Sequence, residues 1–434
     1  MIIMPGVKIC PTLLTFCGAW TVIEIIYNKC QWKTAAGWYA LLAVMTITSI
    51  GIVANIYGFT TLYGTDTSLP ELVNTDQHRY FYNALLLRNG ITPQDPAYQF
   101  GYSYFILAIW KITGVTITPL LIVNQFAFLL TLLLTADITS KTVKHSSAPT
   151  IAIILCASVC YLLNHSTLLL KESLVTLSIV CYASAMVNNN NKYRRIKLIS
   201  AVLILGLIRF HWFPYLLVIT PAAYFSNKGY KKIIPEALAV ITAVWAGFYF
   251  IYENIALNII TSTGIENSFV TDDNSRNAFW TIIGPYFDYP VWKKLLLTPI
   301  TSAVQVITPF PWNYGRDMIY GLTQWYSHIA YPWYAVFGLI TYFFVFCSWN
   351  KNCDATLRTI SFIGLTLWLV PVFLFAGSVS RYALPAVPLL VPCAAYVLAA
   401  KKYLTKTFRI WFGTYCILIA ATLIVIYNLT STPV

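Results

Sequence analysis

Charged residues are scarce in this 434-residue chain: they make up 10% of it, against 58% hydrophobic residues. Soluble globular domains carry about 25% charged residues, so the composition excludes a water-soluble protein of this size. The apolar runs at 38–59 and 118–136 approach the ~20 residues that a helix needs to cross the hydrocarbon layer. Such segments are helical because lipid offers the backbone no hydrogen-bond partners. No period-2 alternation is present, which argues against an outer-membrane barrel.

The sequence therefore predicts an all-α protein, a polytopic transmembrane helical bundle of about twelve spans that forms a single integral membrane domain over 1–434. Internal repeats are lacking. The first apolar run also lacks the basic start and the small-residue cleavage site of a signal peptide. The expected spans are 9–27, 35–58, 117–137, 149–163, 173–187, 197–209, 213–226, 233–252, 330–348, 359–376, 383–400 and 410–428.

Acidic residues are outnumbered by basic ones, 15 to 28, which gives a net charge of +13. The basic residues gather in loops at every second break between the expected spans, the positive-inside pattern of cytoplasmic loops. Both termini are then expected outside. The excess favours contact with anionic membrane lipids and does not indicate nucleic acid. These basic residues are Lys29, Lys33, Lys141, Lys144, Lys192, Arg194, Arg195, Lys197, Lys228, Lys231, Lys232, Lys351, Arg358, Lys401, Lys402, Lys406 and Arg409.

The acidic residues concentrate in the other set of loops, on the expected external face. Two of these loops, 59–116 and 253–329, are long, and loops above ~15 residues are uncommon unless they are functional. They contain the stretches 101–114 and 293–312, which are too short or too broken to span and are expected to be interfacial helices. We therefore expect the chemistry on the non-cytoplasmic face. The external acids are Asp66, Glu71, Asp76, Asp95, Glu172, Glu253, Glu266, Asp272, Asp273, Asp288 and Asp317.

Neither long external loop contains a cysteine. Without a thiol pair in the oxidising compartment, no disulfide framework is expected. Cys156 and Cys160 are one helical turn apart, but no histidine pair accompanies them at zinc spacing. We expect them to be small core residues.

Asp76 begins the first group of candidate functional residues. Asp76, Tyr80 and Ala84 are spaced i, i+4 and i+8, with Leu87 at i+11, so they share one face of a short helix at the membrane surface. A carboxylate at a helix N-terminus is also favoured electrostatically. A simple N-cap is therefore the structural alternative to a functional role for Asp76.

The remaining groups are charged residues at expected external ends of helices. Lys171 and Glu172 lie in a short turn at the membrane boundary, where an unneeded charge is costly; a snorkelling lysine and a helix-capping glutamate are the alternatives. Arg209 and His211 lie at an external corner, and Arg381 lies in another external turn. Cations at the outer end of an apolar bundle suit a lipid phosphate. The arginines could instead pair structurally with acids of the same face.

These residues resemble the GT-C superfamily of membrane glycosyltransferases, which use polyprenyl-phosphate-linked sugars. The likeness in layout covers residues 60–225. The acidic motif of the family, Asp-Glu-x-x-Tyr-x-x-x-Ala, has a counterpart in the first external loop, and a second acid follows in the next short external loop. A later Arg-Tyr-x-x-Pro-x-x-Pro motif also has a counterpart. The matching residues are Asp76, Tyr80, Ala84, Glu172, Arg381, Tyr382, Pro385 and Pro388.

The resemblance implies an inverting sugar transfer. Asp76 would act as general base on an acceptor hydroxyl, which attacks the anomeric carbon in line. Cationic side chains would stabilise the polyprenyl phosphate that leaves, and Glu172 would orient Lys171 or the acceptor sugar. The implied catalytic residues are Asp76 and Glu172. The implied substrate-binding residues are Tyr80, Lys171, Arg209, His211, Arg381 and Tyr382.

The sequence departs from the family motif at Gln77, where a second acid is frequent. One carboxylate fewer makes a poorer site for a hard cation. The sequence therefore names no cofactor, and a divalent cation at this site stays open.

The implied partners are a polyprenyl-phosphate-linked sugar, a lipid-linked or surface glycan acceptor, and membrane lipids, at the periplasmic face of a bacterial inner membrane. Two alternatives remain open. A polymerase of the O-antigen or capsular polysaccharide type, which joins lipid-linked repeat units, would share the layout. A flippase or transporter of lipid-linked sugars would show ionisable residues within spans and matched halves. Only Glu24 lies plainly within a span, and no matched halves are visible.

Overall fold

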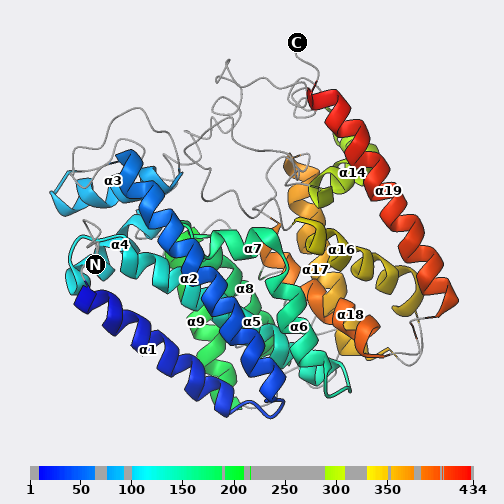
Figure 1. The fold of residues 1–434 in the computed structure, drawn as a ribbon, viewed down its shortest axis with the longest axis horizontal. Helices are drawn as coiled ribbons and strands as arrows, with labels where there is room; N and C mark the ends of the chain where they lie inside the picture. The colour runs from blue at the N-terminus through cyan, green and yellow to red at the C-terminus, as the bar shows by residue number, and fades with distance from the viewer. Residues whose placement is uncertain are drawn as a thin grey trace.

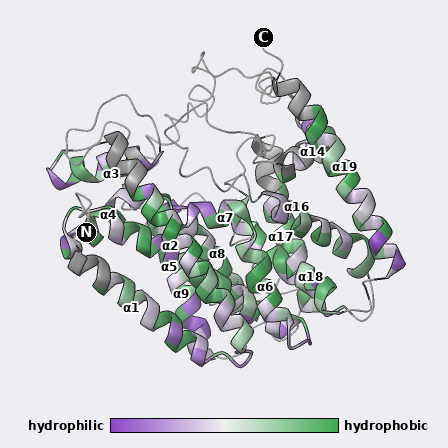
Figure 2. Cartoon of the chain, in the orientation of Figure 1, coloured by the Kyte–Doolittle hydropathy of each residue, from purple (hydrophilic) through white to green (hydrophobic). Residues whose placement is uncertain are grey.

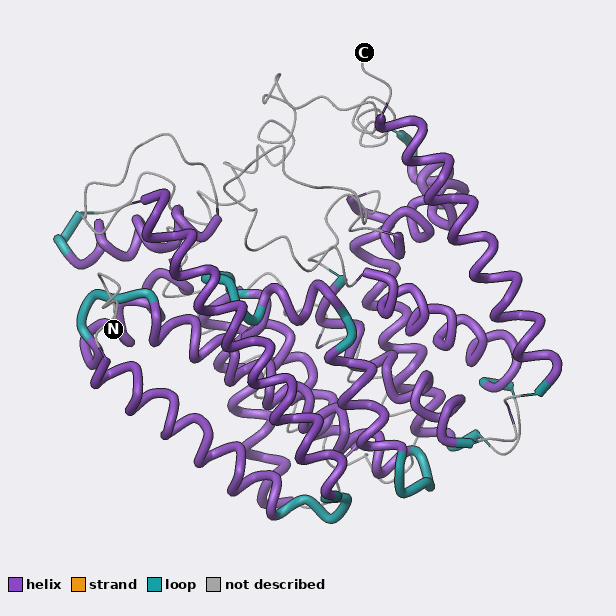
Figure 3. The backbone as a smooth tube through the Cα atoms, viewed as in Figure 1, coloured by secondary structure: helices purple, strands orange, loops and turns teal. Residues whose placement is uncertain are grey.

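The computed structural model describes residues 9–63, 76–91, 100–187, 191–209, 216, 289–307, 330–349, 353–375, 383–400, 403 and 405–431. Within these ranges the chain is helical and contains no strand, as expected for an all-α protein (Figure 3). The helices are α1 Ile9–Asn28, α2 Ala35–Tyr63, α3 Asp76–Arg88, α4 Phe100–Thr113, α5 Thr118–Thr142, α6 Ala148–Ala157, α7 Cys160–His165, α8 Glu172–Val187, α9 Asn191–Arg209, α14 Val291–Ile307, α16 Ala330–Tyr342, η5 Phe343–Cys347, α17 Ala355–Phe375, η7 Leu384–Ala386, α18 Val387–Ala399 and α19 Lys406–Ser431.

Three of the described helices are long and apolar enough to cross a membrane, namely Ala35–Ile56, Thr118–Thr142 and Lys406–Val425. Several others are apolar but shorter than 18 residues. The bundle of about twelve spans thus stays a prediction based on hydropathy. The expected spans 213–226 and 233–252 lie outside the described residues.

Helix α5 is the central element of the N-terminal half (Figure 1). It packs against α1, α2, α6, α8 and α18, and most of its length is buried by other helices. Helix α19 is its opposite, because no residue of its apolar window is buried. The large side chains of Ile410, Ile417 and Leu418 are exposed on it. Figure 2 shows hydrophobic residues distributed along this helix. Such a surface is stable only in an apolar solvent, which agrees with a position facing lipid.

The expected span 149–163 is interrupted. It consists of the short helices α6 and α7, separated at Val159, whose backbone is extended with φ −77° and ψ 101°. The break is not visible in the sequence because the run is apolar on both sides of it. Cys156 and Cys160 flank the break and are fully buried, which confirms them as small core residues.

Helices α8 and α9 form an antiparallel pair whose register is set by polar side chains. The Ser178 hydroxyl donates to the Ala201 carbonyl oxygen over 2.6 Å. Nearer the connection between the helices, the Lys197 ammonium donates to Ser184 Oγ over 2.7 Å. In this register the last residue of α9, Arg209, lies opposite the first residue of α8, Glu172.

The stretches 101–114 and 293–312 each contain a described helix, and their position at a membrane interface stays a prediction. Helix α4 covers the stretch 101–114 and stops at Gly114, whose φ of +74° favours glycine. Helix α14 lies within the second long loop, and the indole of Trp333 on α16 donates to its Val306 carbonyl oxygen over 2.9 Å. Trp292 and Leu295 of α14 are exposed, as expected for a helix that lies at an interface.

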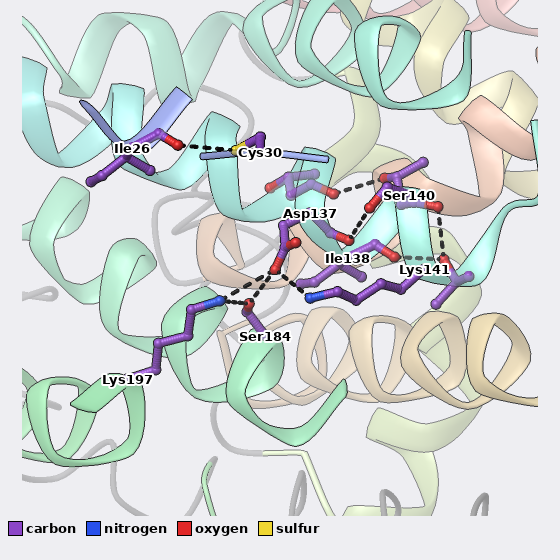
Figure 4. Close-up of polar contacts among 11 residues, drawn as sticks. Ile26, Cys30, Asp137, Ile138, Ser140, Lys141, Ser184 and Lys197 are labelled. Carbon is purple, nitrogen blue, oxygen red and sulfur yellow. Dashed lines mark hydrogen bonds and ion pairs between the residues drawn. The ribbon is translucent and has the colours of Figure 1, made fainter. Parts of the chain in front are cut away.

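The end of α5 that leads to α6 carries a charged network that sequence inspection did not single out (Figure 4). Asp137 Oδ2 accepts hydrogen bonds from Lys141 Nζ at 2.9 Å and from Lys197 Nζ at 3.2 Å. The Ser184 hydroxyl reaches the same oxygen over 3.3 Å. Cys30, from the α1–α2 connection, lies beside this network. The network ties α5, α8 and α9 together at the end opposite to Glu172 and Arg209.

Candidate functional site

The turn at 166–171, between α7 and α8, is fully buried although it is not helical. Its peptide groups therefore need partners inside the protein. Asn124 of α5 supplies two of them, since its Nδ2 donates to the carbonyl oxygens of Leu168 at 2.7 Å and Leu170 at 2.8 Å. The sequence folds this way because one carboxamide offers two hydrogens to two carbonyls that no helix satisfies.

Two further amide side chains complete the support of the turn. Asn55 of α2 donates from Nδ2 to the Thr167 carbonyl oxygen over 3.0 Å. The Leu169 N–H donates to Gln77 Oε1 of α3 over 2.9 Å. Asn55 also donates to the same Gln77 oxygen over 3.3 Å. Helices α2, α3 and α5 thus converge on this turn. They fix its last residue, Lys171, and the residue that follows it, Glu172.

Lys171 lies inside the protein, with 1% of its surface exposed. The alternative of a snorkelling interfacial lysine is therefore wrong. Its Nζ lies 5.2 Å from the centre of the Tyr80 ring, within range of a cation–π interaction. Tyr80 is also 1% exposed and makes an edge-to-face contact with Tyr102 of α4, with ring centres 5.0 Å apart. One face of α3 thus meets both the turn and α4.

Glu172 and Arg209 are each 2% exposed and face each other. Arg209 Nη1 lies 3.5 Å from Glu172 Oε1. A buried carboxylate is stable only with a cation or several hydrogen bonds, and the guanidinium supplies the cation. The structural alternative of an arginine paired with an acid of the same face is realised for Arg209, so its proposed contact with substrate is a role additional to this pair.

Tyr102 belongs to the same cluster, and sequence inspection missed it. Burial raises the pKa of its phenol above the usual range, a hydrogen bond from Asn124 Nδ2 at 3.4 Å opposes this, and the Glu172 carboxylate raises it further. The phenol therefore stays protonated at physiological pH. Its only sequence signal was its place near the start of the apolar stretch 101–114, which was expected to be an interfacial helix.

Four predicted site residues, Tyr80, Lys171, Glu172 and Arg209, are brought together, and with Tyr102 we call them the buried charge cluster. Asp76 is the first residue of α3, one helical turn before Tyr80, and its side chain lies outside the described residues. The other predicted residues, His211, Arg381 and Tyr382, also lie outside the described residues. Their placement at the site stays a prediction.

A narrow crevice borders Glu172, too small for a water molecule. His165 lines it, although nothing in the sequence marked this residue as part of a site. Its Nδ1–H donates to the Tyr161 carbonyl oxygen over 2.7 Å. Leu384 of η7 lines it from the C-terminal half, three positions after Arg381. The lining residues are Phe128, Thr131, Leu162, His165, Glu172, Ser173, Thr176 and Leu384.

The cluster is suited to an anion more than to a metal ion. It holds two cations, Lys171 and Arg209, and one carboxylate, Glu172. Among the described residues, no group of three or more histidine, cysteine, aspartate or glutamate side chains could hold a metal ion. Desolvated cations of this kind interact strongly with phosphate, because the protein interior screens charge less than water does.

Comparison with known proteins gives little guidance. No family model matches the chain, and no curated protein matches it in sequence. Two solved structures share some similarity: ArnT from Cupriavidus metallidurans in the apo state and the same protein bound to undecaprenyl phosphate. They have 11% and 12% identity and TM-scores of 0.36 and 0.35, over 86% and 85% of this chain and 78% of each of those chains. A likeness this weak carries no argument about function.

Proposed function

We propose that this chain is a membrane glycosyltransferase. It moves a sugar from a polyprenyl-phosphate-linked donor to a lipid-linked or cell-surface glycan acceptor, at the periplasmic face of a bacterial inner membrane. The observation that carries the proposal is the buried charge cluster at one end of an apolar bundle. A charge buried without need is costly in such a protein, and ionisable groups at membrane depth are usually functional.

Lys171 and Arg209 stabilise the phosphate in this proposal. As the bond between the anomeric carbon and the phosphate oxygen breaks, the phosphate keeps the electron pair and gains negative charge. Fixed cations in a water-poor site stabilise such a charge because they need no reorganisation. Glu172 holds the Arg209 guanidinium through the 3.5 Å contact, so its role is to orient that cation.

Asp76 is the proposed general base. It removes the proton of an acceptor hydroxyl, and the hydroxyl oxygen attacks the anomeric carbon from the side opposite to the phosphate, which inverts that carbon. Its support is its place in the fold: Asp76 begins α3, and Tyr80, one turn later on the same helix, contacts Lys171. The base and the cations are thus assigned to neighbouring elements.

His211, Arg381 and Tyr382 are proposed as further substrate-binding residues. His211 follows Arg209 by two positions, and Arg381 precedes by three positions Leu384, which lines the crevice next to Glu172. These sequence distances support their inclusion. Donor phosphate would then be bound by residues of both halves of the chain.

Binding of the lipid phosphate tests the proposal directly. Undecaprenyl phosphate is titrated into the detergent-solubilised protein, and binding is followed by native mass spectrometry. Lys171→Met keeps the apolar stem and removes the charge, and we expect it to weaken binding about 30-fold, the equivalent of about 2 kcal/mol for one lost charged contact. Lys111→Met, the same change at an exposed position of α4, should leave binding unaltered. Equal affinity of both variants would contradict the proposal.

A glycan profile tests the reaction. Deletion of the gene should remove one sugar from a surface glycan, and the wild-type gene should restore it. Asp76→Asn should not restore it, because the amide cannot accept the acceptor proton. Full rescue by Asp76→Asn would remove Asp76 from catalysis. Single-unit glycans without chain extension would indicate a polymerase, and internal accumulation of finished lipid-linked units would indicate a flippase.

A further inference from the structure

Gln77 directly follows Asp76, the proposed base, and its side chain accepts two buried hydrogen bonds. Only 9% of its surface is exposed. Its Oε1 accepts the Leu169 N–H over 2.9 Å and the Asn55 amide over 3.3 Å. Leu169 is two residues before Lys171 and is itself fully buried. The contact therefore links the first turn of α3 to the turn that carries a proposed phosphate ligand.

Gln77 and Tyr80 lie on the same face of α3, at i and i+3, and each contacts the turn region. Gln77 accepts a hydrogen bond from the Leu169 N–H, and the Lys171 ammonium lies over the Tyr80 ring. Asp76 precedes Gln77 on the same helical turn. A shift of the Gln77 contact would therefore change the position of Asp76 relative to Lys171.

We infer that Gln77 is a positioning residue that sets the register between the Asp76 helix and the Lys171–Glu172 turn, an inference that rests on the function proposed for those residues. The contact requires an acceptor on the side chain, because the buried Leu169 N–H has its hydrogen bond there. Misplacement of reacting groups by about 1 Å can cost about 100-fold in rate. A glutamine can thus matter for transfer without touching the substrate.

The test compares matched substitutions. Gln77→Met keeps the length of the side chain and removes the acceptor. Gln77→Glu keeps an acceptor oxygen in either protonation state. Gln125→Met is the control, because Gln125 is another buried glutamine whose amide joins two helices: it donates to Met45 O at 3.0 Å, Thr48 Oγ1 at 2.7 Å and Ser49 Oγ at 2.9 Å. Its hydrogen bonds go to α2 and none of them goes to the turn.

Two measurements are made on each full-length variant in detergent. Hydrogen–deuterium exchange reports on the amides of 166–171, and native mass spectrometry reports on the affinity for undecaprenyl phosphate. We expect Gln77→Met to speed exchange at Leu169 and to weaken binding about tenfold, the equivalent of about 1.4 kcal/mol. Gln77→Glu should remain within about threefold of the wild type in affinity, and Gln125→Met should change neither quantity at this turn.

Several outcomes would overturn the inference. Unchanged exchange at Leu169 in Gln77→Met would show that the contact does not hold the turn. Faster exchange with wild-type affinity would show a structural role alone, and equal losses of affinity in Gln125→Met would show general destabilisation. If the wild type binds no undecaprenyl phosphate, the proposed function itself fails and the positioning role fails with it. Should Gln77→Met not fold, Gln77→Asn, which shortens the side chain by one methylene, replaces it with the same expectations.

Discussion

The first residue of α8 and the last residue of α9 form a buried ion pair: Glu172 Oε1 lies 3.5 Å from Arg209 Nη1. At the other end of the same helix pair, Lys197 bonds Ser184 and Asp137. The two helices are thus joined by polar contacts at both ends. The pair at the Glu172 end is the more deeply buried of the two, so it is the more sensitive to the loss of one partner.

Glu172→Gln should destabilise the protein by about 3 kcal/mol, because breaking a buried pair leaves the guanidinium charge buried without its carboxylate. The change keeps the size of the side chain, so packing is preserved. Thermal unfolding in detergent, followed by tryptophan fluorescence, measures the effect. Glu24→Gln makes the same chemical change on α1 at a position within an expected span, where loss of the charge should not lower stability. Equal melting temperatures for the two variants would refute the pair.

Gly101→Ala should prevent the close approach of α4 and α9. A Cβ at Gly101 would overlap the backbone carbonyl oxygen of Leu207 on α9. The two helices must then separate. This displaces Arg209, which lies two residues after Leu207 on α9. We expect aggregation on purification or a loss of stability of at least about 3 kcal/mol, the range of severe overpacking.

Gly413→Ala is the control for that substitution. No atom lies within 4 Å of a Cβ at Gly413 on α19, and alanine is favoured over glycine in a helix by about 1 kcal/mol. This variant should purify as the wild type does, with equal or higher thermal stability. A well-folded Gly101→Ala protein with an unchanged melting temperature would contradict the described approach of α4 and α9.

Cys30 should react slowly with neutral alkylating reagents. Burial raises the pKa of its thiol from 9.0 to about 11, and the negative charge of Asp137 contributes to this rise. Since the thiolate is the nucleophile, about 1% of the thiol is reactive at pH 9, against about half of an ordinary one. In a variant that retains Cys30 alone, the rate with iodoacetamide should rise about tenfold per pH unit from pH 8 to pH 10.

Asp137→Asn provides the matched comparison for this thiol. Removal of the carboxylate lowers the Cys30 pKa, so the rate at pH 9 should increase. The nearby Lys141 and Lys197 also lower the Cys30 pKa, because both cations favour the thiolate. A rate for the parent protein that levels off near pH 9 would show an ordinary thiol.

Asn124→Asp should loosen the turn at 166–171. The carboxylate replaces two N–H donors that bind the carbonyl oxygens of Leu168 and Leu170, and its charge repels those oxygens. The Leu170 oxygen loses its donor and the Leu168 oxygen keeps only the Leu170 N–H, so we expect a cost of about 1–3 kcal/mol. Chemical denaturation in detergent gives the value. Asn28→Asp, at an exposed end of α1, should change stability by less than about 0.5 kcal/mol. An equal effect of the two variants would show that the Asn124 hydrogen bonds do not hold the turn.

Sequence inspection found the features that depend on local patterns. The helix from Asp76, with Tyr80 and Ala84 on one face, is present, and Tyr80 and Ala84 are both buried. The stretch 101–114 is a helix that ends at a glycine. These features follow from a periodicity of 3.6 residues and from the few residues that stop a helix, which can be read within about twenty residues.

The same inspection missed features that depend on distant parts of the chain. Gln77 was noted only as a departure from a motif, yet its oxygen binds Leu169. Tyr102 and Asn124 were not singled out, and Asp137 was overlooked although it joins three helices. An amide or a carboxylate looks alike in the sequence whether it faces lipid, water or a buried turn.

By itself, the sequence indicated a membrane environment and located most of the described helices, because apolarity and helical period are properties of short segments. It also nominated Lys171, Glu172 and Arg209 through the cost of placing charge in an apolar chain. Only the tertiary structure decided that Lys171 lies over the Tyr80 ring and that Glu172 pairs with Arg209. It also decided that Asn55, Gln77 and Asn124 hold the turn between α7 and α8. The reason is physical: a buried hydrogen bond depends on which helices pack together, and packing is settled by the whole chain at once.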